Sequence, residues 1–419
     1  MKALRRFAAI VHADLRERSR ATRFWVVMGL LGALTWLCFP PLGVDYVTVG
    51  FEAARGRYSS AWIGMVLALM YSTTLSLFGF YLVRGTLVRD FETRVWQLLV
   101  ATPMTRGSFL LAKWCSHMAV FALLIGIGLG VGLVAQWYRG EVREYDLWQL
   151  LQPSLWIAMP ALAVTAFLAV LFDMLPWLRR SAGNVLYFVV WILLFIAAFG
   201  GVDQPGVPAA GTLWLSDPAG VGLATRDIRE VLAVSQPGLE IGGLNIGMSI
   251  VEGKIGSFDW PAWSPGGMDI LGRLLWPMGC LVGLLALAPL LDWSAARTAS
   301  AAERSSGGAG LRLRWLDPVL RPLEHFAFGR LFAAELKLIL RQRQRRWWLF
   351  LLGACALQVL ASGAGQATGV LLGWLLLLDV FARAVLREQE GGTAALVLSA
   401  PDARWRLLGV RLAVALTLA

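Results

Sequence analysis

The sequence predicts an all-α fold, a polytopic integral membrane protein built as a helical bundle. The prediction rests on the composition and on the recurrence of long apolar stretches. Hydrophobic residues make up 58% of the 419 residues, charged residues make up 16%, and the mean hydropathy is +0.63. A soluble chain of this size is about one-quarter charged and must present polar surface to water. The composition therefore excludes a soluble enzyme, a disordered chain and a disulfide-rich scaffold.

The apolar stretches predict about eight full spans plus a partial ninth. A helix needs about 20 residues to cross the hydrocarbon of a bilayer. We expect spans at residues 24–40, 60–83, 109–135, 153–173, 184–200, 269–291, 347–362 and 368–386, and a ninth at 407–419. No small-residue cleavage site accompanies the first stretch, so we expect it to stay in the membrane.

The distribution of charge sets the expected orientation. The net charge is +11, and Lys and Arg outnumber acidic residues on the segments that share a side with the N-terminus. Acidic residues outnumber them on the other side, and such an asymmetry is typical of cytoplasmic and outer loops. We therefore expect a multi-pass protein of the plasma (inner) membrane with a cytoplasmic N-terminus in contact with membrane lipid. The basic residues are spread over short loops, so nucleic acid is not a predicted partner.

Small and polar residues within the predicted spans allow two interpretations. Gly128 lies one helical turn from Gly132 in the third span, which favours close helix packing, with a functional hinge as the alternative. The hydroxyls of the second span can bond to their own helix or a neighbour, or they can line a substrate path. These hydroxyl residues are Ser72, Thr73, Thr74 and Ser76. The charged residues lie near span ends, where they can reach the headgroups. They are Asp173, Asp379 and Arg383.

Two segments of the N-terminal region recur later in the chain. Residues 15–20 (LRERSR) match residues 340–345 (LRQRQR), and residues 89–92 (RDFE) match residues 387–390 (REQE). Extending the second match without a gap aligns Leu98 with Leu396, Pro103 with Pro401, Arg106 with Arg404 and Lys113 with Arg411. Both copies begin on the predicted cytoplasmic side, so the repeat is expected to be parallel, with an axis along the membrane normal.

The repeat predicts two six-span halves. The first half is residues 1–291, residues 292–330 form a cytoplasmic linker rich in Ser and Gly, and residues 331–419 begin the second half. A chain of 419 residues is too short for two complete halves. We therefore expect the second half to be incomplete and the chain to be a shortened version of a longer protein.

The first copied segment, residues 1–23, predicts an amphipathic, elbow-like helix in the headgroup layer. Phe7, Ile10 and Leu15 fall on one helical face, whereas Arg18 marks the polar side. The alternative is a plain basic anchor for the first span.

The second copied segment, residues 84–108, predicts a short helix that lies across the cytoplasmic face. Charged residues precede an amphipathic turn, and Pro103 ends the helix before the third span. Such a helix suits docking onto a soluble partner. A solvated loop, charged only for topology, would account for the arginines but not for acidic residues at the same place in both copies.

The repeated pattern resembles the permease subunits of type-2 ABC exporters. It reads Arg, an acidic residue, any residue and Glu, then Leu-Leu or Leu-Val, then Thr-Pro or Ala-Pro, an Arg, and a basic residue in the next span. The resemblance covers the region between the second and third spans twice, and the elbow-like segment before spans one and seven. Glu390-Gly-Gly-Thr is close to the Glu-x-Gly-Thr pattern of the family, whereas Glu92-Thr-Arg-Val departs from it.

The resemblance implies a coupling segment in each copy and a separate ABC ATPase subunit as partner. The residues that it assigns to ATPase coupling are Arg89, Asp90, Glu92, Pro103, Arg106, Arg387, Glu388, Glu390, Pro401 and Arg404. The chain has no G-x-x-x-x-G-K-[ST] phosphate loop, so we expect ATP hydrolysis on another polypeptide and no enzyme activity here. The cysteines and histidines are isolated, and no catalytic, metal or cofactor site is predicted.

The outer segment, residues 201–268, is acidic and contains loosely alternating residues at 238–257 that predict short strands. A small lid, or a cap that docks an extracytoplasmic accessory protein, is favoured over a passive loop. Trp260 and Trp263 are expected at the outer membrane interface.

Two other classes compete with the permease interpretation. A secondary transporter with six-plus-six parallel repeats is the main alternative, but that class needs ionisable residues at mid-membrane. An intramembrane enzyme needs converging catalytic side chains within the spans, and the sequence shows none.

Overall fold

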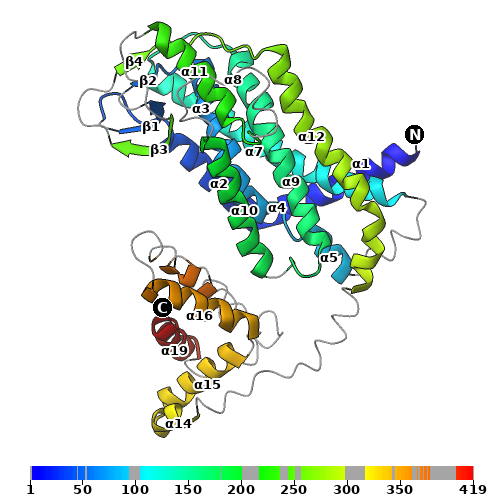
Figure 1. Ribbon diagram of the computed structural model, residues 1–419, viewed down its shortest axis with the longest axis vertical. Helices are drawn as coiled ribbons and strands as arrows, with labels where there is room; N and C mark the ends of the chain where they lie inside the picture. Colours follow the sequence, from blue (N-terminus) through cyan, green and yellow to red (C-terminus); the bar gives the residue numbers. More distant parts are fainter. Residues whose placement is uncertain are drawn as a thin grey trace. The chain divides into compact units, whose positions relative to one another are not determined.

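The computed structural model divides the chain into two compact units, Met1–Ala301 (unit 1) and Ala302–Ala419 (unit 2). Both units are mostly helical (Figure 1), and each is described by itself. The structure describes residues 2–44, 46–51, 54–93, 104–179, 181–200, 217–235, 244–250, 256–297, 317–341, 345–360, 366, 369–370, 372–374, 376–377 and 403–418.

Unit 1 is a bundle of helices with a small sheet at one end, and α1 and α5 lie at the opposite end (Figure 1). Two of the long rods contain a π-helical turn, at Tyr71–Leu75 between α3 and α4 and at Ser154–Ala158 between α8 and α9. A short 3₁₀ turn, Ala288–Leu290, follows the last helix of the bundle. The helices are α1 (Lys2–Arg20), α2 (Thr22–Leu37), α3 (Ser60–Met70), α4 (Ser76–Val83), α5 (Thr86–Glu92), α7 (Arg106–Arg139), α8 (Leu147–Pro153), α9 (Met159–Met174), α10 (Ser181–Gly200), α11 (Val221–Ser235) and α12 (Gly267–Leu287).

Four helical rods of the described chain are long and apolar enough to cross a membrane. They are Ser60–Glu92, Arg106–Arg139, Leu147–Met174 and Gly267–Arg297, and shorter apolar helices occupy Phe24–Leu37, Gly183–Ile196 and Trp347–Val359. A mainly helical protein with helices of membrane-spanning length is therefore confirmed. The full count of spans stays a prediction.

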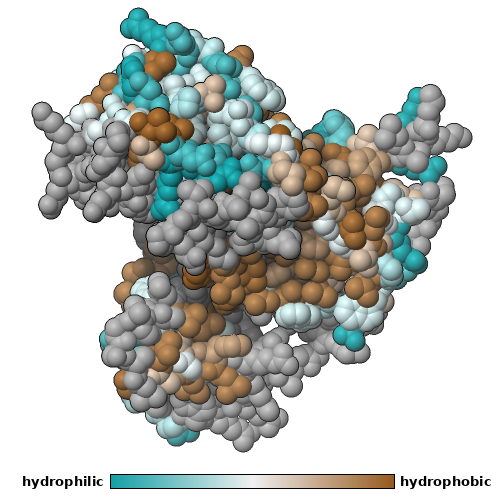
Figure 2. Space-filling model, turned by 45° about the horizontal axis from the view of Figure 1, so that its top comes forward, coloured by the Kyte–Doolittle hydropathy of each residue, from teal (hydrophilic) through white to brown (hydrophobic). Residues whose placement is uncertain are grey.

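The surface of unit 1 suits an apolar solvent around its middle. Figure 2 shows apolar side chains gathered over the flank of the bundle and hydrophilic ones towards its ends. Large apolar side chains such as Leu30, Leu193 and Leu285 are exposed, each by about 60%. Inside the bundle, α3 is buried along its whole length. A helix buried on all sides has no need of a polar face, so the unbroken apolar sequence of α3 fits its central position.

The glycines of α7 confirm the packing interpretation. Gly128 and Gly132 are buried against the α3–α4 rod, whereas nothing lies within reach of a Cβ on Gly126 or Gly130. A Cβ on Gly128 would collide with the hydroxyl of Tyr71, which is itself hydrogen-bonded to a buried threonine of α2 at 2.9 Å. The spacing of four residues thus lets two helices approach closely.

A four-stranded sheet caps one end of unit 1, and the predicted all-α fold class is incomplete in this respect. Strands β1 (Tyr46–Phe51), β2 (Ala54–Gly56), β3 (Leu244–Ile250) and β4 (Gly256–Phe258) follow the order β3-β1-β2-β4. Strand β1 pairs antiparallel with β2 and β3, and β2 pairs parallel with β4. Only the strands of the outer segment were foreseen. The first two were missed, although the buried Val47 and Val49 alternate with Tyr46 and Thr48 along β1.

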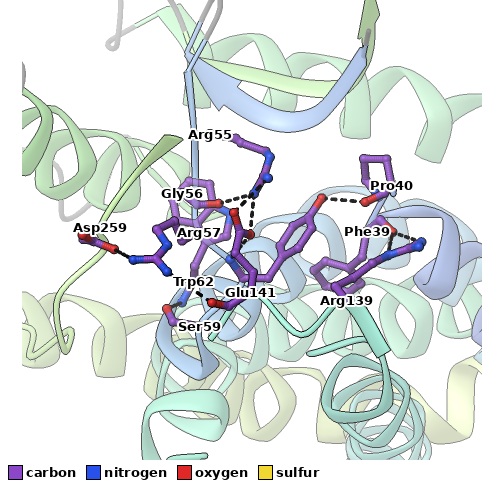
Figure 3. A network of polar contacts seen from close by, with 11 residues as sticks. Phe39, Pro40, Arg55, Gly56, Arg57, Ser59, Trp62, Arg139, Glu141 and Asp259 are labelled. Atoms are coloured by element: carbon purple, nitrogen blue, oxygen red, sulfur yellow. Dashed lines mark hydrogen bonds and ion pairs between the residues drawn. The ribbon is translucent and has the colours of Figure 1, made fainter. Parts of the chain in front are cut away.

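A polar network holds the sheet against the bundle (Figure 3). The carboxylate of Glu141, just beyond α7, accepts two hydrogen bonds from Arg55 at 2.9 and 3.1 Å and one from the Tyr58 amide at 2.9 Å. Arg57 bridges to Asp259 at 3.0 Å, next to β4. A bidentate Arg–carboxylate pair fixes orientation as well as distance, so strand β2 is held in one orientation beside the end of α7, and Arg57 links it to the residue after β4.

The described part of the outer segment packs into the bundle. Trp260 and Trp263 are buried rather than placed at the membrane interface, and Trp62 of α3 lies edge-on to Trp260 with ring centroids 5.9 Å apart. Arg273 of α12 is also buried, and its guanidinium donates to the carbonyl oxygens of Trp156 and Ile157, both at 3.0 Å. These carbonyls belong to the π-turn, where the helical hydrogen-bond ladder is interrupted. The Arg273 side chain therefore satisfies backbone groups that the π-turn leaves available.

Unit 2 contains a second, smaller core. Its described helices include α14 (Asp317–Leu320), α15 (Ala327–Arg341), α16 (Arg345–Leu360) and α19 (Ala403–Leu418). A 3₁₀ turn, Arg321–His325, links α14 to α15. Helix α15 packs on α19 through side chains that include Leu336, Leu340 and Val410.

Adding a methyl group at two α7 positions separates close packing from helix propensity. We expect Gly128→Ala to destabilise the protein by about 1–3 kcal/mol, because the core there has no room for a Cβ. Gly130→Ala is the matched control, and it should be neutral or stabilise by up to about 1 kcal/mol through helix propensity. Thermal unfolding in detergent measures both, and equal midpoints for the two variants would contradict the packing at Gly128.

Candidate functional site

The turn between α4 and α5 is built around a glycine and an aspartate. Gly85 has φ of +88°, a left-handed conformation that favours glycine and lets the chain reverse after the long rod. The Asp173 carboxylate, from the end of α9, accepts hydrogen bonds from the amides of Gly85 at 2.9 Å and Leu87 at 3.3 Å. Amides at a helix start have no intrahelical partner, so a carboxylate stabilises them. Asp173 is thus buried as a cap and does not extend to the headgroups.

A buried ionic cluster lies beneath α5. The ammonium group of Lys113 in α7 contacts Asp14 of α1 at 2.9 Å and Asp90 of α5 at 2.6 Å. The three residues, which we call the Lys113 junction, are exposed by only 2%, 7% and 8%. Charges removed from water this far are stable only when paired. The junction therefore fixes three helices from separate parts of the sequence on one cation.

Helix α1 makes further polar contacts with the same region. The Arg18 guanidinium donates to the carbonyl oxygens of Leu82 at 3.4 Å and Val83 at 3.1 Å, at the end of α4. Glu17 accepts a hydrogen bond from Arg89 at 2.6 Å. The Arg18 side chain caps α4, so its predicted place on the outward polar side of α1 is corrected. Carbonyls at a helix C-terminus favour a cation, which accounts for the position of this arginine.

Two further sets of contacts hold α5 next to the Lys113 junction. Thr86, the first residue of α5, shares a hydrogen bond of 3.0 Å with Nε2 of His117, one turn after Lys113 in α7. Arg179 donates to the Asp173 carbonyl oxygen at 2.6 Å, and its guanidinium lies 5.1 Å from the centroid of the Phe91 ring. Burial lowers the pKa of the Arg179 guanidinium, and the Asp173 charge opposes that shift. Helix α5 is thereby held along both of its turns.

The structure separates the predicted coupling residues into buried and displayed ones. Asp90 is enclosed in the Lys113 junction, so it is not presented to a partner. Glu92, at the end of α5, is exposed, and Arg89 is about one-third exposed beside Glu17. Arg106 forms an ion pair with Asp292. Of the predicted coupling residues on α5, Arg89 and Glu92 are accessible, whereas Asp90 holds the helix to Lys113 of α7.

Several predicted site residues lie outside the described part of the chain. These residues are Pro103, Arg387, Glu388, Glu390 and Pro401. Arg404 lies near the start of α19. The amphipathic turn expected after Glu92 falls on residues 94–103, which are also outside the described residues.

Unit 2 contains an ion pair of the same kind. Arg411 of α19 aligns with Lys113 in the repeat, and its Nε contacts Glu335 of α15 at 2.9 Å. Helix α15 packs on α19 as α1 packs on α7. The acidic partner lies one helical turn earlier than the residue that aligns with Asp14. In both units, a basic residue of one helix therefore pairs with a buried acid of an amphipathic helix.

Sequence reasoning identified the charged segment but missed the groups that hold it. Asp14, His117 and Asp173 come from three different helices, and nothing in their local sequence reveals that they converge. Lys113 was noted only as a repeated basic position. A signal was present in Asp14, which interrupts the apolar face of α1 in line with Ile10 and Arg18. Spacing of four residues on a buried face suggests a paired charge.

The comparisons with known proteins do not place the chain in a family. No family model, no curated protein and no solved structure matches it. Among the residues that the structure describes, no group of three or more His, Cys, Asp or Glu side chains is arranged to hold a metal ion.

Removing the cation of the junction should be strongly destabilising. Lys113→Met leaves two buried carboxylates without a partner, and we expect a loss of about 3–5 kcal/mol of stability. The triple variant Lys113→Met, Asp14→Asn, Asp90→Asn should recover much of that loss, because the buried charges are gone. Thermal unfolding in detergent gives the comparison. A single variant as stable as the wild type, or a triple variant less stable than the single, would contradict the assignment.

Proposed function

We propose that the chain is the membrane-spanning permease of an ATP-driven ABC exporter, and that it works with a separate ATPase subunit. In this proposal the N-terminus and α5 face the cytoplasm, and the sheet faces the outside of the plasma (inner) membrane. The charge asymmetry of the loops supports this orientation. The resemblance of residues 84–108 and their later copy to type-2 exporter permeases supports the class.

The observation that carries the proposal is the way α5 is mounted. A seven-residue helix at the end of the bundle is attached to α1, α7 and α9 by buried charged groups. Such a short helix would not be stable alone in water. Because α5 is attached rigidly, a soluble partner that binds its exposed residues, Arg89 and Glu92, can move the long helices of the bundle.

The ion pair of unit 2 supports the repeated architecture. A permease of two similar halves presents one coupling segment per half to two ATPase domains. The Arg411–Glu335 pair joins α19 to the amphipathic helix α15, as the Lys113–Asp14 pair joins α7 to α1 in unit 1, with the acid one helical turn earlier in unit 2. Similar ion pairs between corresponding helices of the two units favour the two-half interpretation over a chance match of short sequences.

The secondary transporter is the weaker alternative. Its mechanism needs ionisable groups at mid-membrane that can exchange ions or protons. Three of the four buried carboxylates that the structure describes in unit 1, Asp14, Asp90 and Asp173, lie at the α1–α5 end of the bundle. The fourth, Asp217, accepts hydrogen bonds from the amides of Val221 and Leu223, both at 3.0 Å. Each is already engaged by a cation or by backbone amides, which favours a mechanical role.

Co-purification tests the proposal. The tagged full-length chain, solubilised in mild detergent, should retain an ATPase that carries a phosphate-binding loop, identified by mass spectrometry. The double variant Glu92→Lys, Glu390→Lys should reduce retention of the ATPase, or the ATP hydrolysis it supports, by at least tenfold, because reversed charges repel the docking surface.

A charge reversal at the other end of unit 1 is the matched control. Glu144→Lys changes an exposed acid beyond α7 and should leave ATPase retention unchanged. Thermal unfolding shows whether both proteins are folded. Equal retention by the double variant and the control would contradict docking through these segments. If no ATPase is retained by the wild type under any gentle extraction, the permease proposal itself fails.

A further inference from the structure

A pocket opens in the middle of unit 1, away from the Lys113 junction. Its walls come from the π-turn between α3 and α4, from α9 and from α10, and it reaches the residues before α11. The enclosed space is only about 40 Å³, so the pocket would receive one end of a ligand rather than enclose a whole molecule. The lining residues used below are Ser76, Val164, Thr165, Tyr187 and Trp191.

The lining has no charged side chain. Aliphatic and aromatic groups dominate it, and its polar groups are hydroxyls and one indole. A charged ligand would lose its hydration in a pocket that offers no counter-charge. The desolvation of such an unpaired ion costs roughly several kcal/mol. The pocket therefore disfavours carboxylates, phosphates and ammonium groups.

The hydrogen-bond donors of the pocket are already in use. The Tyr187 hydroxyl donates to the Ser76 carbonyl oxygen at 2.6 Å, and the Trp191 indole donates to the Thr73 carbonyl oxygen at 3.0 Å. The hydroxyls of Ser76 and Thr165 donate to backbone carbonyls of their own helices, at 2.6 and 3.3 Å. A hydroxyl has one proton to donate but two lone pairs. What these groups still offer a ligand is acceptor capacity.

The π-turns give the pocket its position. The turn Tyr71–Leu75 packs against the turn Ser154–Ala158. A π-turn inserts one residue into a helix and shifts the side chains on either side of it, and such turns are frequent at functional sites. The span-two hydroxyls bond back to their own helix, and three of them also face this pocket.

We infer that the pocket binds a neutral, mainly apolar molecule that supplies hydrogen-bond donors of its own, such as a long-chain alcohol or another lipid-like molecule with a hydroxyl group. The apolar walls can pack against the hydrocarbon part of such a molecule. The pocket hydroxyls, whose own protons are already donated, can accept a hydrogen bond from the ligand hydroxyl. The role of the ligand as an exported substrate rests on the proposed permease function. The binding itself can be tested without the ATPase.

Photolabelling in lipid nanodiscs tests the inference. Three diazirine probes of equal chain length are compared on the full-length protein: a fatty alcohol, a fatty acid and an alkane. The alcohol should label peptides of α9 and α10 at least fivefold more than the acid does. Val164→Trp, which fills the pocket, should reduce alcohol labelling at least fivefold. Val189→Trp is the matched control on α10, because Val189 is 40% exposed and does not line the pocket.

A second variant tests the pocket without filling it, in case Val164→Trp fails to fold. Thr165→Val keeps the shape of the side chain but removes its hydroxyl, so it should lower labelling by the alcohol and leave labelling by the alkane unchanged. Equal labelling by alcohol and acid, or labelling that Val164→Trp does not reduce, would overturn the inference. Alcohol binding in a chain that retains no ATPase would leave the pocket standing and remove the transport function.

Discussion

The structure of unit 1 depends on one buried cation. Lys113 lies on α7, a helix of 34 residues, and its ammonium group neutralises carboxylates from α1 and from α5. In an apolar interior none of these three charges is stable without the others. The position of α1 against the bundle and the position of α5 below the α3–α4 rod are therefore set together. Rotating either helix by one residue would separate a buried carboxylate from the ammonium group.

Other polar contacts fix the structure at each end of the bundle. At the α5 end, Asp173 caps the short helix and Arg18 caps the rod before it, so the reversal at Gly85 occurs with few backbone groups left unsatisfied. At the sheet end, Glu141 joins the first outer strands to α7. Between them, Gly128 and Gly132 allow α7 to lie against the α3–α4 rod. One helix, α7, thus connects the two ends of the bundle.

The sequence predicted the parts that depend on local pattern. Apolar runs located the long helices, the spacing of glycines located the close contact at Gly128, and the first charged segment located α5. The later copy of that segment lies outside the residues that the structure describes. It could not predict which charges are buried. Asp90 was expected to face a partner and instead pairs with Lys113, because the choice depends on α1 and α7 arriving at the same place. The first strands, β1 and β2, were missed for a similar reason, since β1 pairs with a strand almost 200 residues away in sequence.

Hydrogen exchange of α5 tests most directly whether the Lys113 junction holds this helix. In the full-length protein, the amides of residues 86–92 are compared between the wild type and Lys113→Met, with the amides of residues 60–70 in α3 as the internal reference. Loss of the cation should speed exchange of α5 at least tenfold while the reference stays protected, because local opening no longer requires separation of buried charges. Equal exchange of α5 in both proteins, with α3 equally protected, would contradict the account.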